Sequence, residues 1–454
     1  MLNTSLFLKK NLLYLVLLFI ILLLTLFISF NNLRNYNTWW ADDGGAHIAY
    51  TKTILEKQRL PTFEETYLSW HEPLYYLILA GWSKIGEFFQ NDSLNWWESL
   101  NVFFYFIFLF LVWLLAYDYS QKNKWLALLN VFLFSIFFVG IKLSVYVNNE
   151  ILVHVLIILL VILFCRWQLL AKNKQKLVIW WSIILGLATL VKLTAFIILL
   201  VAIIIWLFNF VANKKRYFLL YIFFVIFIVG AINIPWFIYK QNKFGEAFSI
   251  NLYERQNKQN ILKSDGWQYL RKINYKIFFD YPYWYSQPQS FFSILLGDSF
   301  GDYYNLFNNV DKINSIPVEQ KILVNNGRYT TANLWQSMLL INRVGFFITL
   351  IWFVGFFGEA LLVIRNKEID YYKFFLMILF FAGLAALIYN NLRFPYLERG
   401  VAKAAFIYFT FPLLTAISYS WWWQRFKNKI IAVIFILIPL LIYLGVAWPI
   451  LLVS

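Results

Sequence analysis

Long apolar runs alternate with short polar segments along most of the chain. Because a helix needs about 20 mainly apolar residues to cross a bilayer, each run of roughly this length predicts a membrane-spanning helix. The two shortest runs lie on either side of Lys192, where one long helix with a break would also fit. The pattern predicts eleven spans: 11–30, 98–118, 125–146, 149–170, 177–192, 193–211, 217–238, 342–364, 372–390, 402–421 and 429–450.

Basic residues in the short loops predict the orientation of these helices. If the N-terminus is cytoplasmic, the basic clusters QKNK, AKNKQK, NKKR, RNK and QRFKNK all fall on the cytoplasmic side, as positively charged loops prefer. The first apolar run is long enough to span and has no small-residue cleavage site after it, so we expect a retained helix rather than a signal peptide.

The same alternation places two longer polar segments, 31–97 and 239–341, outside the membrane. We expect three parts: an N-terminal membrane module (1–238) that carries the first external loop, an external insertion with interfacial helices (239–341), and C-terminal membrane helices (342–454). The mixture of bases and aromatics in the insertion is typical of helices that lie along a membrane surface. The sequence shows no inverted repeat of the kind that many transporters contain.

Composition agrees with a polytopic membrane protein. Of 454 residues, 61% are hydrophobic and only 14% are charged, whereas soluble domains carry about a quarter charged residues. The net charge of +16 is explained by cytoplasmic loops, so no nucleic-acid partner is predicted. A single cysteine, Cys165, excludes an internal disulfide framework and a cysteine zinc site.

Unusual polar residues follow the first apolar run, in the stretch WWADDGGAHIAY. A helix over 44–57 would place Asp43 and His47 on one face, and would end before the Leu60-Pro61 pair. An aspartate before a helix commonly accepts backbone N–H bonds as an N-cap. One cap is sufficient, so the other member of the Asp42-Asp43 pair is available for chemistry.

A second polar cluster follows in the same loop, in SWHEPLYYLILAGWSKIGE. Pro73 predicts the start of a short helix, with His71 and Glu72 at its N-terminal end. The apolar and aromatic residues after Pro73 suit a helix at the membrane interface.

Together these stretches resemble the first external loop of the GT-C glycosyltransferases, which include protein O-mannosyltransferases and the aminoarabinose transferase of lipid A. Spacing from His47 matches Asp43 to the family aspartate. The chain departs from the pattern at Gly44, where an acid usually follows, and at Glu72, which replaces a proline. Two later pieces, YVNNEILVHVLIILL and LGLATLVKLTAFIILL, also resemble this family, and they contain Asn149-Glu150 and Lys192.

The resemblance implies an all-α membrane fold and inverting transfer of a sugar from a polyprenyl-phosphate donor to an acceptor at the outer face of the cytoplasmic membrane. Such transfer requires a base for the acceptor proton and positive charge at the leaving phosphate. We expect Asp43 to be the base, with Asp42 as its companion or substitute. The acceptor could be a protein, a lipid or a glycan.

Basic residues at the outer ends of spans are candidates for the donor phosphate. An ionisable residue in an apolar stretch, such as Lys192, is costly and therefore a candidate for function, although it could also snorkel to the interface. Basic residues in the outer loop near span ten contradict the inside bias, so they need a partner such as a lipid phosphate, or an acid such as Glu398. The donor-phosphate candidates are Lys192, Arg393, Arg399, Lys403 and His71.

The remaining candidates would position the acceptor or orient the acids. Glu150 has an alternative explanation, because asparagine caps helices and an acid favours the positive end of a helix. His154 could then pair with Glu150. Asp298 and Asp302 could face the acceptor or lie in a solvated turn. The acceptor-site or orienting candidates are His47, Glu72, Glu150 and Asn149.

The spacing of the acids requires no metal site and predicts no cofactor, although a divalent cation held by Asp43 and Glu150 stays open. The expected partners are the lipid-linked sugar, its acceptor and membrane lipids. Alternatives are a transporter or flippase of lipid-linked sugars, a surface-polymer polymerase or ligase, and a catalytically inactive scaffold. A transporter would carry its charges at mid-span, whereas here the acids gather in the first loop.

Overall fold

The computed structural model describes residues 4–36, 43–91, 93–170, 174–214, 216–247, 270–273, 275–279, 290–301, 323–325, 328–330, 332–365, 370–393 and 404–452. Its N-terminal helices are α1 (Thr4–Asn35), α2 (Gly44–Lys57), α3 (Leu74–Phe88), α4 (Leu94–Tyr119), α5 (Lys124–Ile136), α6 (Phe138–Ser144), α7 (Glu150–Leu170), α8 (Lys174–Val191), η2 (Leu193–Ala195), α9 (Phe196–Asn213) and α10 (Tyr217–Phe244). The later elements are α13 (Lys276–Phe279), α14 (Phe291–Phe300), β1 (Leu323–Asn325), β2 (Arg328–Thr330), α15 (Ala332–Arg365), α16 (Tyr371–Arg393), η6 (Ala404–Ile407), α17 (Thr410–Arg425) and α18 (Lys429–Leu451).

The described part of the chain is almost wholly helical, as the apolar pattern predicts. Its two strands form a short antiparallel hairpin, in which Val324 pairs with Tyr329. Every predicted span corresponds to helical structure, but the count of eleven is not confirmed. Among the described residues, seven helices are long and apolar enough to cross a membrane, or eight if the bent pair α5–α6 is one span. The apolar part of α8, Lys176–Val191, is shorter than these seven helices.

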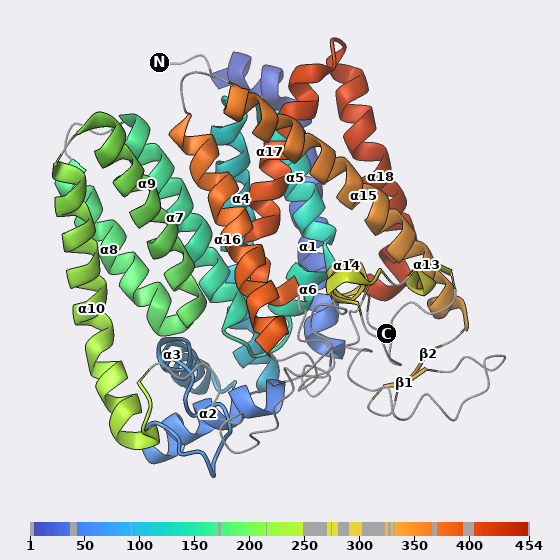
Figure 1. Cartoon of the computed structure of the whole chain (residues 1–454). Helices are drawn as coiled ribbons and strands as arrows, with labels where there is room; N and C mark the ends of the chain where they lie inside the picture. Colours follow the sequence, from blue (N-terminus) through green and yellow to red (C-terminus); the bar gives the residue numbers. More distant parts are fainter. Residues whose placement is uncertain are drawn as a thin grey trace.

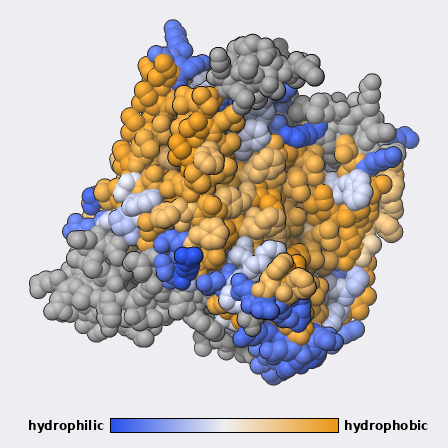
Figure 2. Space-filling model, turned by 180° about the vertical axis from the view of Figure 1, so that it is seen from behind, coloured by the Kyte–Doolittle hydropathy of each residue, from blue (hydrophilic) through white to orange (hydrophobic). Residues whose placement is uncertain are grey.

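The long helices form one bundle with polar ends. Figure 1 places the N-terminus and the α9–α10 and α17–α18 connections at one end, and α2 and α3 at the other. In the view of Figure 2, hydrophobic residues cover most of the side of the bundle and hydrophilic residues gather toward its ends. A wide apolar side between polar ends is the surface that a bilayer requires. The chain is therefore an integral membrane protein.

The predicted span 125–146 is broken at Phe137, whose backbone is extended between α5 and α6. The two helices bend by 61° at this point. The ring of Phe137 packs against the rings of Phe300 on α14 and Trp352 on α15, with centroids 5.2 and 6.1 Å away. The break thus inserts an aromatic side chain between distant helices and fixes α14 against the bundle.

Two further interruptions lie at the ends of predicted spans. The segments on either side of Lys192 are separate helices, because Lys192 is extended (φ −163°, ψ 135°) and the short η2 turn follows it. The predicted span 402–421 begins with the η6 turn, and its α-helix α17 starts only at Thr410. Both interruptions lie near the end of the bundle that holds α2 and α3 (Figure 1).

Candidate functional site

The helix α2 begins at the acidic motif and has the predicted bounds, Gly44–Lys57. Asp43 occupies the N-cap position, but its carboxylate makes no capping bond. Instead Oδ1 of Asp43 accepts a hydrogen bond from the hydroxyl of Tyr67 at 2.5 Å, while the backbone carbonyl of Asp43 accepts from the amide of His47 at 3.0 Å. The side chain is therefore held at the loop surface rather than used to start the helix.

The helix α3 brings the second polar cluster against α2. It follows Pro73, as predicted, and its buried Tyr76 lies between the two histidines of the loop. The Tyr76 hydroxyl is 2.8 Å from Nδ1 of His47 and 3.5 Å from Nδ1 of His71. The ring of Tyr50 stacks on Tyr76 at 3.7 Å, and its hydroxyl donates to the carbonyl of His71 at 3.2 Å. We call Asp43, His47, Tyr50, His71 and Tyr76 the first-loop cluster.

Both histidines of this cluster are uncharged near neutral pH. Burial lowers the pKa of His47 to about 4, against a smaller opposing effect of the Asp43 carboxylate. Burial also lowers the pKa of His71 well below its ordinary value, and the positive charges of Lys192 and Lys240 add to the effect. The imidazoles can therefore donate or accept hydrogen bonds, but they provide no charge for a phosphate.

A buried ion pair attaches the first loop to α10. Nζ of Lys240 lies 3.7 Å from Oε1 of Glu72, and the lysine side chain is fully buried. The ammonium also faces the rings of Trp70 and Trp236, at 5.7 and 5.9 Å from their centroids. Burial raises the pKa of Glu72, while the charge of Lys240 opposes that shift.

Sequence reasoning missed Lys240, because it assigned this residue to the start of the polar insertion. The available signal was helical spacing. Trp236 and Lys240 are four residues apart and share one face of α10, so a cation packed against an aromatic ring could have been expected. The same reasoning overlooked Tyr67 and Tyr76, whose hydroxyls meet Asp43 and the histidines.

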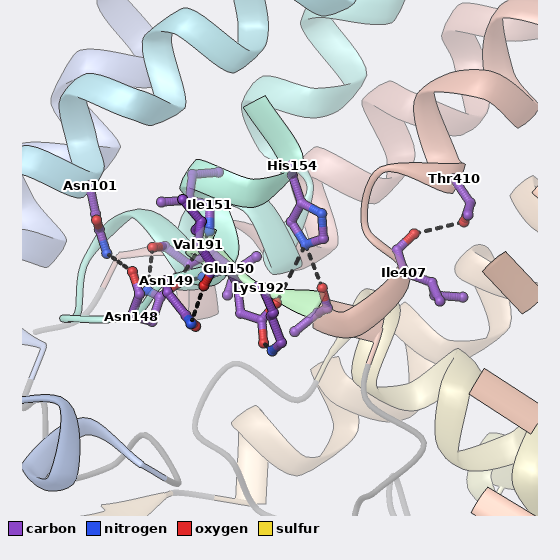
Figure 3. Close-up of polar contacts among 12 residues, drawn as sticks. Asn101, Asn148, Asn149, Glu150, Ile151, His154, Val191, Lys192, Ile407 and Thr410 are labelled. Carbon is purple, nitrogen blue, oxygen red and sulfur yellow. Dashed lines mark hydrogen bonds and ion pairs between the residues drawn. The ribbon is translucent and has the colours of Figure 1, made fainter. Parts of the chain in front are cut away.

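A second ion pair joins the start of α7 to the break after α8. Figure 3 shows Asn148, Asn149 and Glu150 beside Val191 and Lys192. The carboxamide of Asn149 donates to the carbonyl of Val191 at 3.1 Å, and Nζ of Lys192 pairs with Oε1 of Glu150. The helix start itself is capped, because Oδ1 of Asn148 accepts from the amide of Glu150 at 3.0 Å.

The short turn η6 lies next to this pair. The ring of Phe406 is 4.8 Å from Nζ of Lys192, and Nε2 of His154 lies 2.6 Å from the carbonyl oxygen of Ala405. His154 is thus bound chiefly to η6, with Oε2 of Glu150 farther away at 4.0 Å. Asp298, on α14, accepts a hydrogen bond from the amide of Ala404 rather than lying in a solvated turn.

Several predicted site residues are not placed. Asp42, Arg399 and Lys403, and also Asp302, lie outside the described residues, and Arg393 is the last residue of α16, where its side chain is not described. The described candidates form two groups at one end of the bundle. The first contains Asp43, His47, His71 and Glu72, and the second contains Asn149, Glu150 and Lys192.

The described residues do not form a metal site. They contain no group of three or more histidine, cysteine, aspartate or glutamate side chains placed to hold an ion. Oε1 of Glu150 pairs with Lys192, and Nε2 of His154 faces the carbonyl oxygen of Ala405, so these two atoms already have protein partners.

No known family model and no curated protein matches the sequence. The fold, however, is similar to that of solved structures. The oligosaccharyltransferase AglB from Archaeoglobus fulgidus, in complex with an inhibitory peptide and a dolichol-phosphate, matches with a TM-score of 0.54 at 14% identity, over 98% of this chain and 56% of that chain. A structure of the A. fulgidus enzyme with Zn and sulfate matches with a TM-score of 0.52 at 15% identity, over 96% and 52% of the two chains.

ArnT from Cupriavidus metallidurans, bound to undecaprenyl phosphate, is a more distant match, with a TM-score of 0.42 at 11% identity over 90% of this chain and 78% of that chain. This chain spans about half the length of the oligosaccharyltransferase. The similarity confirms the predicted fold class: the chain has a GT-C-like, all-α membrane fold. Zinc in one similar structure is compatible with a divalent cation in proteins of this fold.

Proposed function

We propose that this protein transfers a sugar from a polyprenyl-phosphate donor to an acceptor hydroxyl or amine at the outer face of the cytoplasmic membrane. The observation that carries the proposal is that Asp43 adjoins His47, which Tyr76 connects to His71, at one end of a GT-C-like bundle. The GT-C structures of similar fold contain dolichol-phosphate or undecaprenyl phosphate, which agrees with a lipid-phosphate donor.

In the proposed reaction the acceptor attacks the anomeric carbon directly, and the bond from that carbon to the phosphate oxygen breaks. The phosphate leaves with the bonding electrons. Because the acceptor attacks the face of the anomeric carbon opposite the phosphate, the sugar inverts its configuration. The Asp43 carboxylate takes the acceptor proton as the new bond forms, a role typically worth 10²–10⁴ in rate. The hydroxyl of Tyr67 holds this carboxylate in place.

Positive charge for the departing phosphate would come from Lys192. Its ammonium lies at an interruption between helices, where the side chain keeps 17% of its surface exposed. The pair with Glu150 holds Lys192 in position before the donor binds. Arg393, Arg399 and Lys403 would add charge from the neighbouring segment. His47, Glu72, Glu150 and Asn149 would position the acceptor or the acids.

The proposal is tested in proteoliposomes with a panel of polyprenyl-phosphate sugars, by release of polyprenyl phosphate. We expect the wild type to consume one donor and Asp43→Asn to lose roughly 10²–10⁴ of the rate. Asp42→Asn is assayed in parallel to decide which acid is the base.

Asp370→Asn is the matched control. Asp370 caps α16 through bonds to the amides of Tyr372 and Lys373, and asparagine caps a helix equally well. This variant should keep its activity. Full activity of Asp43→Asn would exclude the proposed base. Consumption of no donor would exclude sugar transfer from these lipids and would favour transport of a lipid-linked sugar.

A further inference from the structure

Tyr76 connects two imidazoles through the same type of nitrogen atom. Its hydroxyl oxygen is within hydrogen-bond distance of Nδ1 of His47, on α2, and of Nδ1 of His71, just before α3. Burial raises the pKa of Tyr76 well above its ordinary value, so the hydroxyl keeps its proton. Two nitrogen atoms therefore share one hydroxyl group that has a single proton to donate.

Counting protons determines the tautomers. A neutral imidazole carries one N–H and one bare nitrogen. Among the described residues the two Nδ1 atoms are the only hydrogen-bond partners of the Tyr76 hydroxyl. Its proton is therefore donated to one Nδ1, which must be bare, and the other Nδ1 can bond the hydroxyl oxygen only by donating an N–H. One histidine must therefore be protonated at Nε2 and the other at Nδ1.

The two distances indicate which ring is which. Bonds donated by a hydroxyl are typically shorter, about 2.7–2.8 Å, than bonds donated by an N–H, about 2.9–3.0 Å. The 2.8 Å contact thus fits donation from Tyr76 to His47. The 3.5 Å contact is long for either kind of bond, so His71 takes the remaining role, as donor of the weaker bond. His47 would carry its proton on Nε2, and Nε2 of His71 would be bare.

Both Nε2 atoms are left for a ligand. In the part of the chain that the structure describes, neither one makes a hydrogen bond. The charged groups that act on the two rings are Asp43 before α2, Lys192 after α8 and Lys240 on α10. Glu72, before α3, acts on the Tyr76 hydroxyl between the rings. Burial is the largest effect on both histidines and keeps the rings neutral.

We propose that Tyr76 holds His47 and His71 in opposite tautomers, so that the neutral pair offers a substrate one N–H donor and one bare nitrogen acceptor. This combination suits a hydroxyl group, which both donates and accepts, rather than a phosphate. Its role in the reaction rests on the proposed function: the pair would bind a hydroxyl of the sugar or of the acceptor, and the phosphate would be left to Lys192.

The chain contains only three histidines, so the ring nitrogen signals of each one can be assigned separately. Protein labelled with ¹⁵N-histidine and reconstituted in lipid gives ring nitrogen signals by solid-state NMR that separate N–H from bare nitrogen at each position. His154 is an internal reference, since Nε2 facing the carbonyl oxygen of Ala405 must carry a proton. We expect two rings protonated at Nε2 and one, His71, protonated at Nδ1.

Tyr76→Phe removes the shared hydroxyl and should abolish or average the Nδ1–H signal. Tyr75→Phe is the matched control, because it removes a neighbouring buried hydroxyl that bonds Asn101 and the amide of Asn148 instead. The control should keep the pattern of the wild type. The rings of His47 and His71 should remain neutral down to pH 6.

Three rings protonated at Nε2 in the wild type would overturn the inference, even if Tyr76→Phe failed to fold. An imidazolium signal from His47 or His71 at pH 6, or a Tyr76→Phe spectrum identical to that of the wild type, would also overturn it. The spectra require no turnover. A protein that transfers no sugar but shows the expected tautomers would disprove the proposed function and leave the tautomer assignment intact.

Discussion

The two ends of the bundle both contain ion pairs, but the pairs connect different kinds of structural element. At the end opposite α2 and α3, Asp118 on α4 pairs with Arg166 on α7, and Glu359 on α15 pairs with Lys373 on α16. These pairs join one long helix to another. At the α2–α3 end, Glu72 joins a loop to α10, and Glu150 joins a helix start to the break at Lys192.

This difference distinguishes ion pairs that stabilise the packing of long helices from ion pairs that position the residues of the candidate site. The pairs at the opposite end connect only the helices on which they lie. At the α2–α3 end, by contrast, Glu72 adjoins His71, and Lys192 acts electrostatically on both histidines. The presence of charge near a helix end is therefore a poor indicator of function by itself. What distinguishes the α2–α3 end is that two of its pairs, Glu72–Lys240 and Glu150–Lys192, adjoin the residues for which we propose a role in substrate binding.

Among the ion pairs at the two ends, the largest effect is expected at Lys192. If its ammonium meets the leaving phosphate, Lys192→Met should reduce sugar transfer by roughly 10²–10³, the typical loss when one group that stabilises developing negative charge is removed. Initial rates of polyprenyl phosphate release measure the loss.

A double variant separates this role from simple pairing with Glu150. Glu150→Gln/Lys192→Met removes both charges, so no uncompensated carboxylate is left. It should remain as inactive as Lys192→Met alone. Recovery of activity in the double variant would mean that Lys192 only neutralises Glu150, and the comparison between the two ends would lose its main support.

The next effect is on stability, at the buried pair of Glu72 and Lys240. Lys240→Met leaves the Glu72 carboxylate buried without its partner, which typically costs about 3–5 kcal/mol. Glu72→Gln/Lys240→Met should recover most of this loss. Chemical unfolding in detergent, followed by tryptophan fluorescence, measures both. Equal stability of Lys240→Met and the wild type would show that the pair does not hold the loop.

A pH dependence of stability is expected from His47. Its folded pKa of about 4 lies below the unfolded value of 6.5, so the folded protein binds fewer protons between these values. The contribution is complete above pH 6.5 and is lost as the pH falls toward 4, by about 3 kcal/mol at 1.36 kcal/mol per pKa unit.

Comparison with His47→Gln isolates this contribution, because Glu72, whose raised pKa acts in the opposite direction, is present in both proteins. The free energy of unfolding should fall more steeply with acid in the wild type than in the variant. If the free energy of unfolding of the wild type and that of His47→Gln fall in parallel between pH 6.5 and 4, His47 is not held neutral by burial.

The smallest effect is expected at the opposite end. The side chains of Arg166 and Asp118 are 43% and 25% exposed, and such pairs are typically worth about 0–1 kcal/mol. Arg166→Met should therefore lower the free energy of unfolding only slightly and leave sugar transfer unchanged. A large loss of transfer without loss of stability would place function at both ends.

The sequence by itself determined the features that depend on neighbouring residues. Apolar runs predicted the helical segments, because burial or lipid contact over some 20 residues is a local property. The two-glycine start and the later Leu60-Pro61 pair predicted the bounds of α2, and Pro73 marked the start of α3. The motif around Asp43 and His47 also indicated the fold class that the structural comparison confirms.

Only the tertiary structure decided which distant side chains meet. Tyr76 is 29 residues from His47, and Lys240 is still farther from Glu72, so no periodicity connects them. The break at Phe137 reflects packing against Phe300 and Trp352, which come from later helices. A hydrogen-bonded or charged contact depends on how helices pack in three dimensions, whereas the apolar pattern records only which residues avoid water.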